Sequence, residues 1–146
     1  MTASGPDLRA RSLHPGVGAG RCLRSEPLSF WGGTDPSTGM LIDERHPRRG
    51  VAITGRVLVM RSGRGSSSSS SVLAEQLRRG VGPAAIVLAE PDAIVVTGAI
   101  VAAELYQRFL PIVLVDPEQL DLLPDDRMMT VTADQATAQI RGEDDT

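Results

Sequence analysis

The sequence predicts an α/β domain in which a mixed sheet with parallel βαβ units is joined to a second, antiparallel β layer, with helices on one side. Between residues 56 and 123, short aliphatic runs alternate with segments of helical periodicity, which is the pattern of parallel βαβ units. The strand patterns before and after this region favour antiparallel strands. Aromatic residues make up only 3% of the chain, so the core must come from Val, Ile, Leu and Ala, which suits this class of fold.

The composition limits the classes of partner. A chain of 146 residues is long enough for one domain with its own core, and its 41% hydrophobic and 23% charged residues are typical of a globular protein. A net charge of −3 argues against nucleic acid as the main partner. The longest apolar stretch, residues 93–105, is too short to span a bilayer, and the N-terminus lacks the hydrophobic segment of a secretory signal. We therefore expect a cytoplasmic protein without a membrane or nucleic-acid partner.

Three segments divide the chain. Residues 1–15 show no apolar periodicity and are predicted to be a flexible arm, residues 16–141 form the predicted domain, and residues 142–146 are predicted to be an acidic tail. The glycine-rich residues 16–23 predict the entry into a strand without a helix behind it, so a dinucleotide-binding fingerprint is not expected. Residues 35–39, Asp-Pro-Ser-Thr-Gly, have turn composition and are predicted to join two strands.

A strand, a glycine-rich loop and a helix organise the middle of the chain. The apolar run over residues 57–60 is typical of a buried strand. Gly63 and Gly65 in the following loop allow a positive φ or a close approach to a ligand. Six consecutive serines, residues 66–71, come next, and a serine at the end of this run is predicted to cap a helix over residues 72–79.

The start of this helix is a candidate anion site. Free backbone N–H groups and hydroxyls gather there, with Arg64 nearby. The loop lacks the lysine of a phosphate-binding P-loop, and six serines also fit a solvated linker without a ligand. Their position directly between a strand and a helix favours the site, because linkers rarely interrupt so tight a unit.

The rest of the chain continues the alternation of strands and helices. In the predicted helix over residues 99–109, Ile100, Val101, Leu105 and Phe109 share one face. The other predicted elements are strands over residues 83–89, 93–96, 112–115, 128–132 and 136–140 and a short helix over residues 117–123.

Several isolated side chains fit a structural role better than a chemical one. His14 and His46 lie apart from any carboxylate cluster in the sequence, so we expect solvated loop histidines and no metal site. The single cysteine, Cys22, excludes a disulfide and an iron–sulfur or structural zinc site built from this chain alone, and is expected as a small buried hydrophobe. Trp31 fits either a plug in the core or an interface, or a wall of a substrate pocket.

Six short stretches of the chain form a combination typical of one family. They are Gly18-Ala19-Gly20, residues 26–33 (Glu-Pro-Leu-Ser-Phe-Trp-Gly-Gly), residues 39–43, His46-Pro47, residues 63–67 (Gly-Arg-Gly-Ser-Ser) and residues 83–86 (Pro-Ala-Ala-Ile). Through these stretches the chain resembles, over roughly residues 16–115, the swivel domain or small subunit of the aconitase X group. The Ser-Phe-Trp-Gly-Gly segment together with the Gly-Arg-Gly-Ser-Ser loop is the specific part of this resemblance.

The resemblance implies the swivelling β/β/α fold of aconitase-like enzymes and the activity of a hydro-lyase. It implies a large catalytic subunit that carries an iron–sulfur cluster, while this chain binds no cofactor alone, closes over the cleft and supplies a catalytic serine. The activities known in the family are dehydration of cis-3-hydroxy-L-proline and of phosphomevalonate. The lysine-free composition indicates a GC-rich bacterium, so a hydroxyproline-type substrate is expected.

The family's catalytic serine follows the second glycine of the loop and corresponds to Ser66. In a run of six serines, Ser67 is the alternative. Arg64, Gly65 and Ser67 are the residues expected to bind the small hydroxy acid. Serine is a poor base unless its oxyanion is stabilised, which helix N–H groups and Arg64 can do once water is excluded.

Two other functions remain open from the sequence. A stand-alone module would hold a phosphate or nucleotide at the serine-rich helix start, and the isolated chain would bind this anion unaided in isothermal titration. A structural interaction domain would use the serines as a linker, and proteases would then cleave within residues 66–71 of the native protein.

Overall fold

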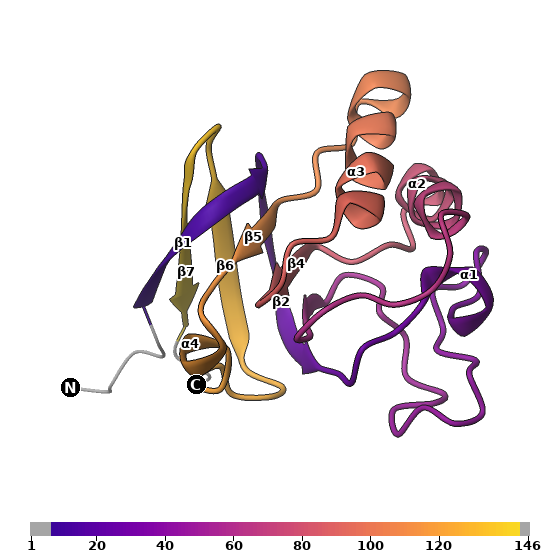
Figure 1. The fold of residues 1–146 in the computed structure, drawn as a ribbon, viewed down its shortest axis with the longest axis horizontal. Coiled ribbons are helices and arrows are strands. Elements are labelled where there is room, and N and C mark those ends of the chain that lie inside the picture. The colour runs from indigo at the N-terminus through magenta and orange to yellow at the C-terminus, as the bar shows by residue number, and fades with distance from the viewer. Residues whose placement is uncertain (1–6, 144–146) are drawn as a thin grey trace.

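Seven strands close into one barrel in the computed structural model, which describes residues 7–143 (Figure 1). In chain order they are β1 (Asp7–His14), β2 (Gly16–Arg24), β3 (Val57–Val59), β4 (Ala85–Leu88), β5 (Ile112–Leu114), β6 (Met128–Ala133) and β7 (Thr137–Gly142). Around the barrel the order is β1, β5, β4, β3, β2, β6 and β7.

The barrel combines parallel and antiparallel pairs, which confirms the predicted mixed α/β character. Strands β2, β3, β4 and β5 are parallel to one another, whereas β1, β6 and β7 complete the circle with antiparallel pairs. The prediction of a separate antiparallel layer is wrong. Strand β1 pairs with β5 on one side and with β7 on the other, so the antiparallel strands close the same sheet on itself.

More than half of the predicted flexible arm forms the first strand of the barrel. Residues Asp7–His14 form β1, so the prediction of a flexible arm over residues 1–15 is wrong for this part. Leu8 and Ala10 pack against the core, while the arginines on either side of Ala10 are exposed. This is the period-two pattern of a strand, with charged residues on the outer face.

The C-terminal border of the domain also lies further along the chain than predicted. Gly142, the first residue of the predicted tail over residues 142–146, pairs with Met129 at the end of β7. The next residue, Glu143, donates its backbone N–H to Met128 O at 2.9 Å. The remaining tail residues, 144–146, and residues 1–6 of the predicted arm lie outside the described residues.

The parallel strands are buried on both faces, which explains their continuous apolar sequences. In β3, Val57 and Val59 belong to the cluster inside the barrel, and Leu58 belongs to the cluster between the barrel and the helices. Cys22 lies in the inner cluster and is fully buried, which confirms its prediction as a buried hydrophobe. Burial, reinforced by the negative charge of Asp125, raises the pKa of the Cys22 thiol to about 12.

We expect Cys22 to be unreactive toward thiol reagents in the folded protein. The thiolate is the reacting form, and a pKa of about 12 against the ordinary 9.0 leaves about a thousandfold less thiolate at pH 8. When a chromogenic disulfide reagent is added to the folded protein, the absorbance should therefore rise only at the rate at which the protein unfolds. After denaturation, Cys22 should react in a single fast phase. Reaction of the native protein at the rate of a free thiol would contradict the burial of Cys22.

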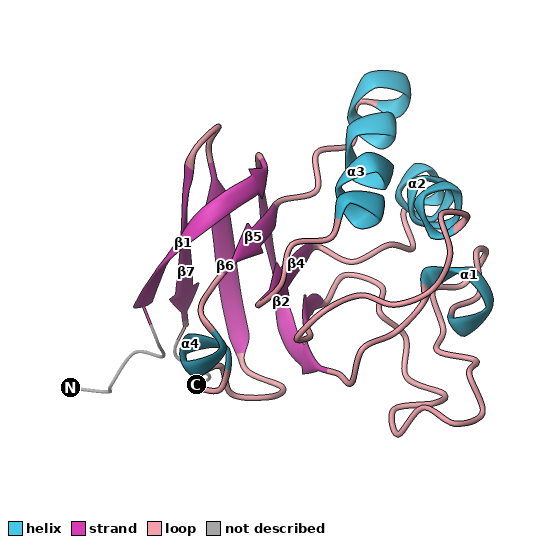
Figure 2. Cartoon of the chain, viewed as in Figure 1, coloured by secondary structure: helices cyan, strands magenta, loops and turns pink. Residues whose placement is uncertain are grey.

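Helices cover the parallel side of the barrel (Figures 1 and 2). These are α2 (Ser69–Arg79) and α3 (Ala93–Tyr106), and the short α1 (Phe30–Gly33) packs against α2. The short helix α4 (Pro117–Leu120) lies apart from them, at one end of the barrel (Figure 1). Helices α2 and α3 pack closely at Gly98, where an added Cβ would lie only 2.8 Å from Ser70 O. Helix α2 ends, as predicted, at Arg79, and the following Gly80 takes the left-handed conformation with φ of 77°.

Helix α3 begins earlier than predicted. The segment predicted as a strand over residues 93–96 is the first turn of the helix. Asp92 caps this turn, because its Oδ1 accepts hydrogen bonds from the backbone N–H groups of Ile94 at 2.9 Å and Val95 at 3.1 Å. The cap and the tertiary packing of α3 outweigh the strand propensity of its β-branched residues.

The buried face of α3 also differs from the predicted one. Gly98, Ala99 and Ala102 are buried, whereas Ile100 is exposed and Leu105 is 66% exposed. Small side chains face α2 because the two helix axes approach closely at Gly98. Val95 is buried as well, but the large side chains of Ile100 and Leu105 do not mark the packed face of the helix.

The two histidines are buried, so the prediction of solvated loop histidines is wrong. His14 Nδ1 forms a hydrogen bond with Leu110 O at 2.8 Å. His46 Nε2 lies 2.9 Å from Ser25 Oγ, and its Nδ1 accepts the backbone N–H of Arg48 at 3.0 Å. Each imidazole thus satisfies buried polar groups and ties a loop to the rest of the fold.

The predicted turn over residues 35–39 is present, but the strands around it are not. Gly39 donates its backbone N–H to Asp35 O at 2.8 Å. The segments on either side form only isolated bridges, which pair Thr34 with Leu41 and Met40 with Ala52.

Candidate functional site

The glycine- and serine-rich loop lies at the edge where the parallel strands end. Residues 60–68 connect the carboxyl end of β3 to α2. The segments that follow β2 and β4 reach the same edge, because the carboxyl ends of neighbouring parallel strands lie side by side. In parallel α/β folds, in closed barrels as in open sheets, ligands bind at this edge.

A pocket of about 190 Å³ forms where these three segments meet. Gly63, Arg64, Gly65 and Ser66 line it from the loop after β3. The other lining residues are Leu28, Phe30, Ser69, Asp92, Ile94 and Val95. The structure thus brings Arg64, Gly65 and Ser66 together.

Ser66 and Ser67 lie in different surroundings. Both serines are exposed, but only Ser66 lines the pocket. The carbonyl of Ser67 accepts hydrogen bonds from both the backbone N–H and the hydroxyl of Ser70, at 3.2 and 2.8 Å. The position of Ser66 in the pocket lining, from which Ser67 is absent, favours Ser66 as the serine that faces a ligand.

The helix begins inside the serine run, not after it. Ser69 is the first residue of α2, and Ser68 at the N-cap makes no side-chain cap hydrogen bond. Among the residues that the structure describes, the backbone N–H groups of Gly65, Ser66, Ser67 and Ser68 have no hydrogen-bond partner. The predicted free N–H groups therefore belong to the loop immediately before the helix, where they can bind an anion.

Both loop glycines are required by close contacts. Gly65 has φ of 106°, and a Cβ at this position would collide with the Ser29 side chain. A Cβ at Gly63 would collide with Asp92 Oδ2. Between them, Arg64 donates its backbone N–H to Leu28 O at 3.1 Å. The loop is thus fixed between the segment after β2 and the start of α3.

The Arg64 side chain supplies positive charge at this edge. It is exposed, and within residues 7–143 its guanidinium forms no hydrogen bond or ion pair. An unpaired guanidinium beside free N–H groups is suited to a carboxylate or phosphate.

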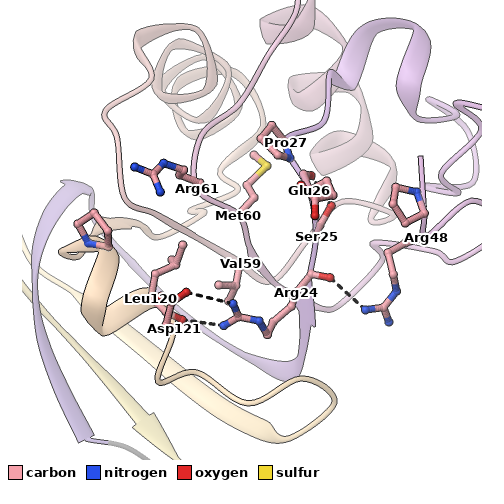
Figure 3. Close-up of a pocket in the computed structure, with 12 residues that line it drawn as sticks. Arg24, Ser25, Glu26, Pro27, Arg48, Val59, Met60, Arg61, Leu120 and Asp121 are labelled. Atoms are coloured by element: carbon pink, nitrogen blue, oxygen red, sulfur yellow. Dashed lines mark hydrogen bonds and ion pairs between the residues drawn. The ribbon is translucent and has the colours of Figure 1, made fainter. Parts of the chain in front are cut away.

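A larger hollow of about 460 Å³ lies at the same edge and is shown in Figure 3. Its arginines are occupied by the protein itself. Arg24 donates to Leu120 O at 2.7 Å and lies 3.6 Å from Asp121, and Arg48 donates to the carbonyl of Arg24 at 3.0 Å. These guanidinium groups hold α4 and a neighbouring loop against the end of β2, so this hollow is a weaker candidate for an anion site.

Three residues that support the loop are not predicted from the sequence, namely Ser29, Ser69 and Asp92. Asp92 lies between the two strands predicted over residues 83–89 and 93–96, although an aspartate before a helical segment is also an N-cap signal. Ser69 is one of six identical neighbours, so its sequence context does not distinguish it. Trp31 is 58% exposed beside this site, which excludes the core position considered for it.

The described residues do not fit an iron–sulfur cluster. Between residues 7 and 143, no group of three or more His, Cys, Asp or Glu side chains could hold a metal ion. The thiol of Cys22 is enclosed in the barrel and is therefore unsuited to ligation. In the same part of the chain, no helix has the length and apolar character that a membrane crossing requires.

The barrel, its two covering helices and the loop at the parallel edge define a small α/β domain of the swivel type. A family model described as the aconitase X swivel domain matches residues 7–140, and the chain belongs to this family. The match begins with β1 and includes the loop, so the resemblance stated from the sequence is confirmed.

Relatives with known names fall into two groups. The chain is 50% identical over 103 residues to cis-3-hydroxy-L-proline dehydratase of Pseudomonas aeruginosa, which covers 70% of this chain and 18% of that protein. It is 39% identical over 131 residues to the phosphomevalonate dehydratase small subunit of Methanothermobacter thermautotrophicus, covering 88% of this chain and 95% of that subunit. The chain therefore spans less than a fifth of the length of the first relative and nearly all of the second.

A solved structure supports the same assignment. The crystal structure of Thermococcus kodakaraensis aconitase X in its holo-form matches with a TM-score of 0.79 and 35% identity. The match covers 93% of this chain and 98% of that chain, so the fold is shared over nearly its whole length.

Proposed function

We propose that the chain is the swivel subunit of an aconitase-X-type hydro-lyase, which dehydrates a hydroxy acid in a cleft shared with a large subunit. The observation that supports this best is the position of Ser66, which lines a pocket beside unpaired backbone N–H groups and the guanidinium of Arg64. The family relationship supplies the class of reaction.

In the proposed reaction, Ser66 removes the proton from the carbon next to the substrate carboxylate. The electron pair of this C–H bond forms the new double bond, and the β-hydroxyl leaves as water once it has gained a proton. A serine hydroxyl is a weak base, so the reaction requires stabilisation of its oxyanion. The N–H groups before α2 and the positive end of this helix can provide it.

Arg64 is proposed to hold the substrate carboxylate. Arg64 lines the pocket next to Ser66, and its side chain has no partner within the described residues. A guanidinium can bind a carboxylate through two parallel hydrogen bonds, which would orient the adjacent C–H bond toward the loop. The departure of the hydroxyl depends on groups outside this chain, and the iron–sulfur cluster is proposed to belong to the large subunit.

The preferred substrate is cis-3-hydroxy-L-proline. The 50% identity to the Pseudomonas enzyme supports it, whereas the 95% coverage of the archaeal small subunit supports phosphomevalonate as the alternative. A third candidate is a stand-alone anion-binding module, which the unpaired N–H groups favour.

The substrate is tested by assembling the chain with its large subunit and assaying both compounds. We expect the complex to dehydrate cis-3-hydroxy-L-proline and the isolated chain to dehydrate neither compound. If the complex dehydrates only phosphomevalonate, the proposed substrate is wrong but the proposed class of enzyme, a hydro-lyase, stands. If the complex is inactive while the isolated chain binds inorganic phosphate in isothermal titration, the stand-alone module is favoured and the enzyme proposal fails.

A further inference from the structure

One serine of the run differs from the other five in its surroundings. Ser69, the first residue of α2, is only 3% exposed. Its Oγ lies 3.2 Å from Ser29 Oγ and accepts the backbone N–H of Trp31 at 3.2 Å. The partners of Ser69 are thus 38 and 40 residues away in the chain, within the Ser-Phe-Trp-Gly-Gly segment.

The proton positions in this cluster follow from its geometry. Ser29 donates its only hydroxyl proton to Trp31 O at 2.7 Å. The hydrogen bond between the two serines must therefore use the proton of Ser69. The result is a closed ring in which Trp31 N–H donates to Ser69, Ser69 donates to Ser29, and Ser29 donates to Trp31 O.

The ring supports the loop that carries Ser66. Gly65 lies directly against the Ser29 side chain, and the loop amide of Arg64 donates to Leu28 O. The backbone N–H of Ser69 also donates to Ser66 O at 3.0 Å. The loop is therefore held on both sides of Ser66: before it, at Arg64 and Gly65, by the segment after β2, and after it by Ser69. A change in the ring would thus move Ser66 relative to the pocket.

We infer that Ser69 is a positioning residue, which places Ser66 for reaction through its ring of hydrogen bonds with Ser29 and Trp31. This inference rests on the proposed function. The proton of Ser69 is donated to Ser29, and its Oγ accepts from Trp31, so Ser69 has no role in proton transfer itself. Moving a reacting group by about 1 Å from its productive position is enough to slow a reaction.

The test compares Ser69→Ala, Ser66→Ala, the double variant and Ser71→Ala, each assembled with the large subunit and assayed with whichever substrate the wild-type complex dehydrates. We expect Ser69→Ala to lower kcat about tenfold, the size of one or two neutral hydrogen bonds, with KM changed less than about twofold. Ser71 lies on the same first turn of α2 but is exposed, and it serves as the matched control, with unchanged kcat.

The double variant separates positioning from a general loss of structure. If Ser69 acts through Ser66, Ser66→Ala with Ser69→Ala should be no slower than Ser66→Ala alone. In the isolated chain, hydrogen exchange at the Trp31 amide should accelerate in Ser69→Ala and stay unchanged in Ser71→Ala.

Three outcomes would overturn the inference. If Ser69→Ala keeps the wild-type kcat while Ser66→Ala is inactive, the positioning role of Ser69 is wrong and the proposed function stands. Losses that multiply in the double variant would assign Ser69 a role independent of Ser66. Wild-type kcat in Ser66→Ala would overturn the catalytic assignment of the proposed function, and the positioning role with it.

Discussion

Replacing Ser66 with alanine is expected to lower kcat of the assembled enzyme by about 10²–10⁴-fold, the range for loss of a positioned general base. The substitution removes only one exposed hydroxyl and leaves the backbone N–H groups and Arg64 in place. Substrate binding and assembly with the large subunit should therefore be nearly unchanged. Steady-state kinetics should show the loss in kcat with little change in KM.

Ser67→Ala is the matched comparison, because the two serines are neighbours in the same loop. Ser67 does not line the pocket, so its replacement should cost much less activity than that of Ser66. Circular dichroism and size-exclusion chromatography of each complex control for folding and assembly. If Ser67→Ala silences the enzyme while Ser66→Ala keeps its activity, the catalytic serine lies one position further along the run.

The loop could be predicted from the sequence because its chemistry is local. Gly63 and Gly65 indicate a backbone that other residues disfavour, and the apolar run before them indicates a buried strand. Both glycines indeed lie where a Cβ would collide with a neighbour. The contact that makes each glycine necessary, however, comes from Ser29 or Asp92, and no local pattern reveals these partners.

Features that depend on distant contacts were not predictable in the same way. The imidazole of His14 is bonded to a carbonyl 96 residues away, so nothing near His14 in the sequence indicates its burial. Strand β1 is stabilised by β5 and β7, whose residues follow about 100 and about 130 positions later. Beyond Val95, the packed face of α3 consists of small residues, whereas hydrophobic periodicity weights the large ones.

The six serines show what the sequence predicts and what only the tertiary structure reveals. Composition alone permits a linker or a site, and identical neighbours cannot be assigned separate roles. In the structure, Ser66 lines the pocket, Ser67 accepts hydrogen bonds from Ser70, and Ser69 is buried against Ser29. Only tertiary contacts distinguish them.

Replacing Phe30 with alanine is expected to lower the free energy of unfolding by about 3–5 kcal/mol, the cost of emptying a buried aromatic position. The chain contains two phenylalanines, so it offers its own control. Phe30 is 1% exposed in the cluster between the barrel and the helices, and Phe109 is 57% exposed. Phe109→Ala should change the unfolding free energy by less than about 0.5 kcal/mol.

Urea denaturation of the two variants checks this prediction, with the midpoints compared at equal slope. Phe30 also lies between Ser29 and Trp31, so the cavity loosens the segment against which the loop is fixed. At temperatures where the variant is still folded, hydrogen exchange at the Trp31 amide should therefore be faster in Phe30→Ala and unchanged in Phe109→Ala. Equal destabilisation by both substitutions would contradict the core position of Phe30 and the support that it gives to the site.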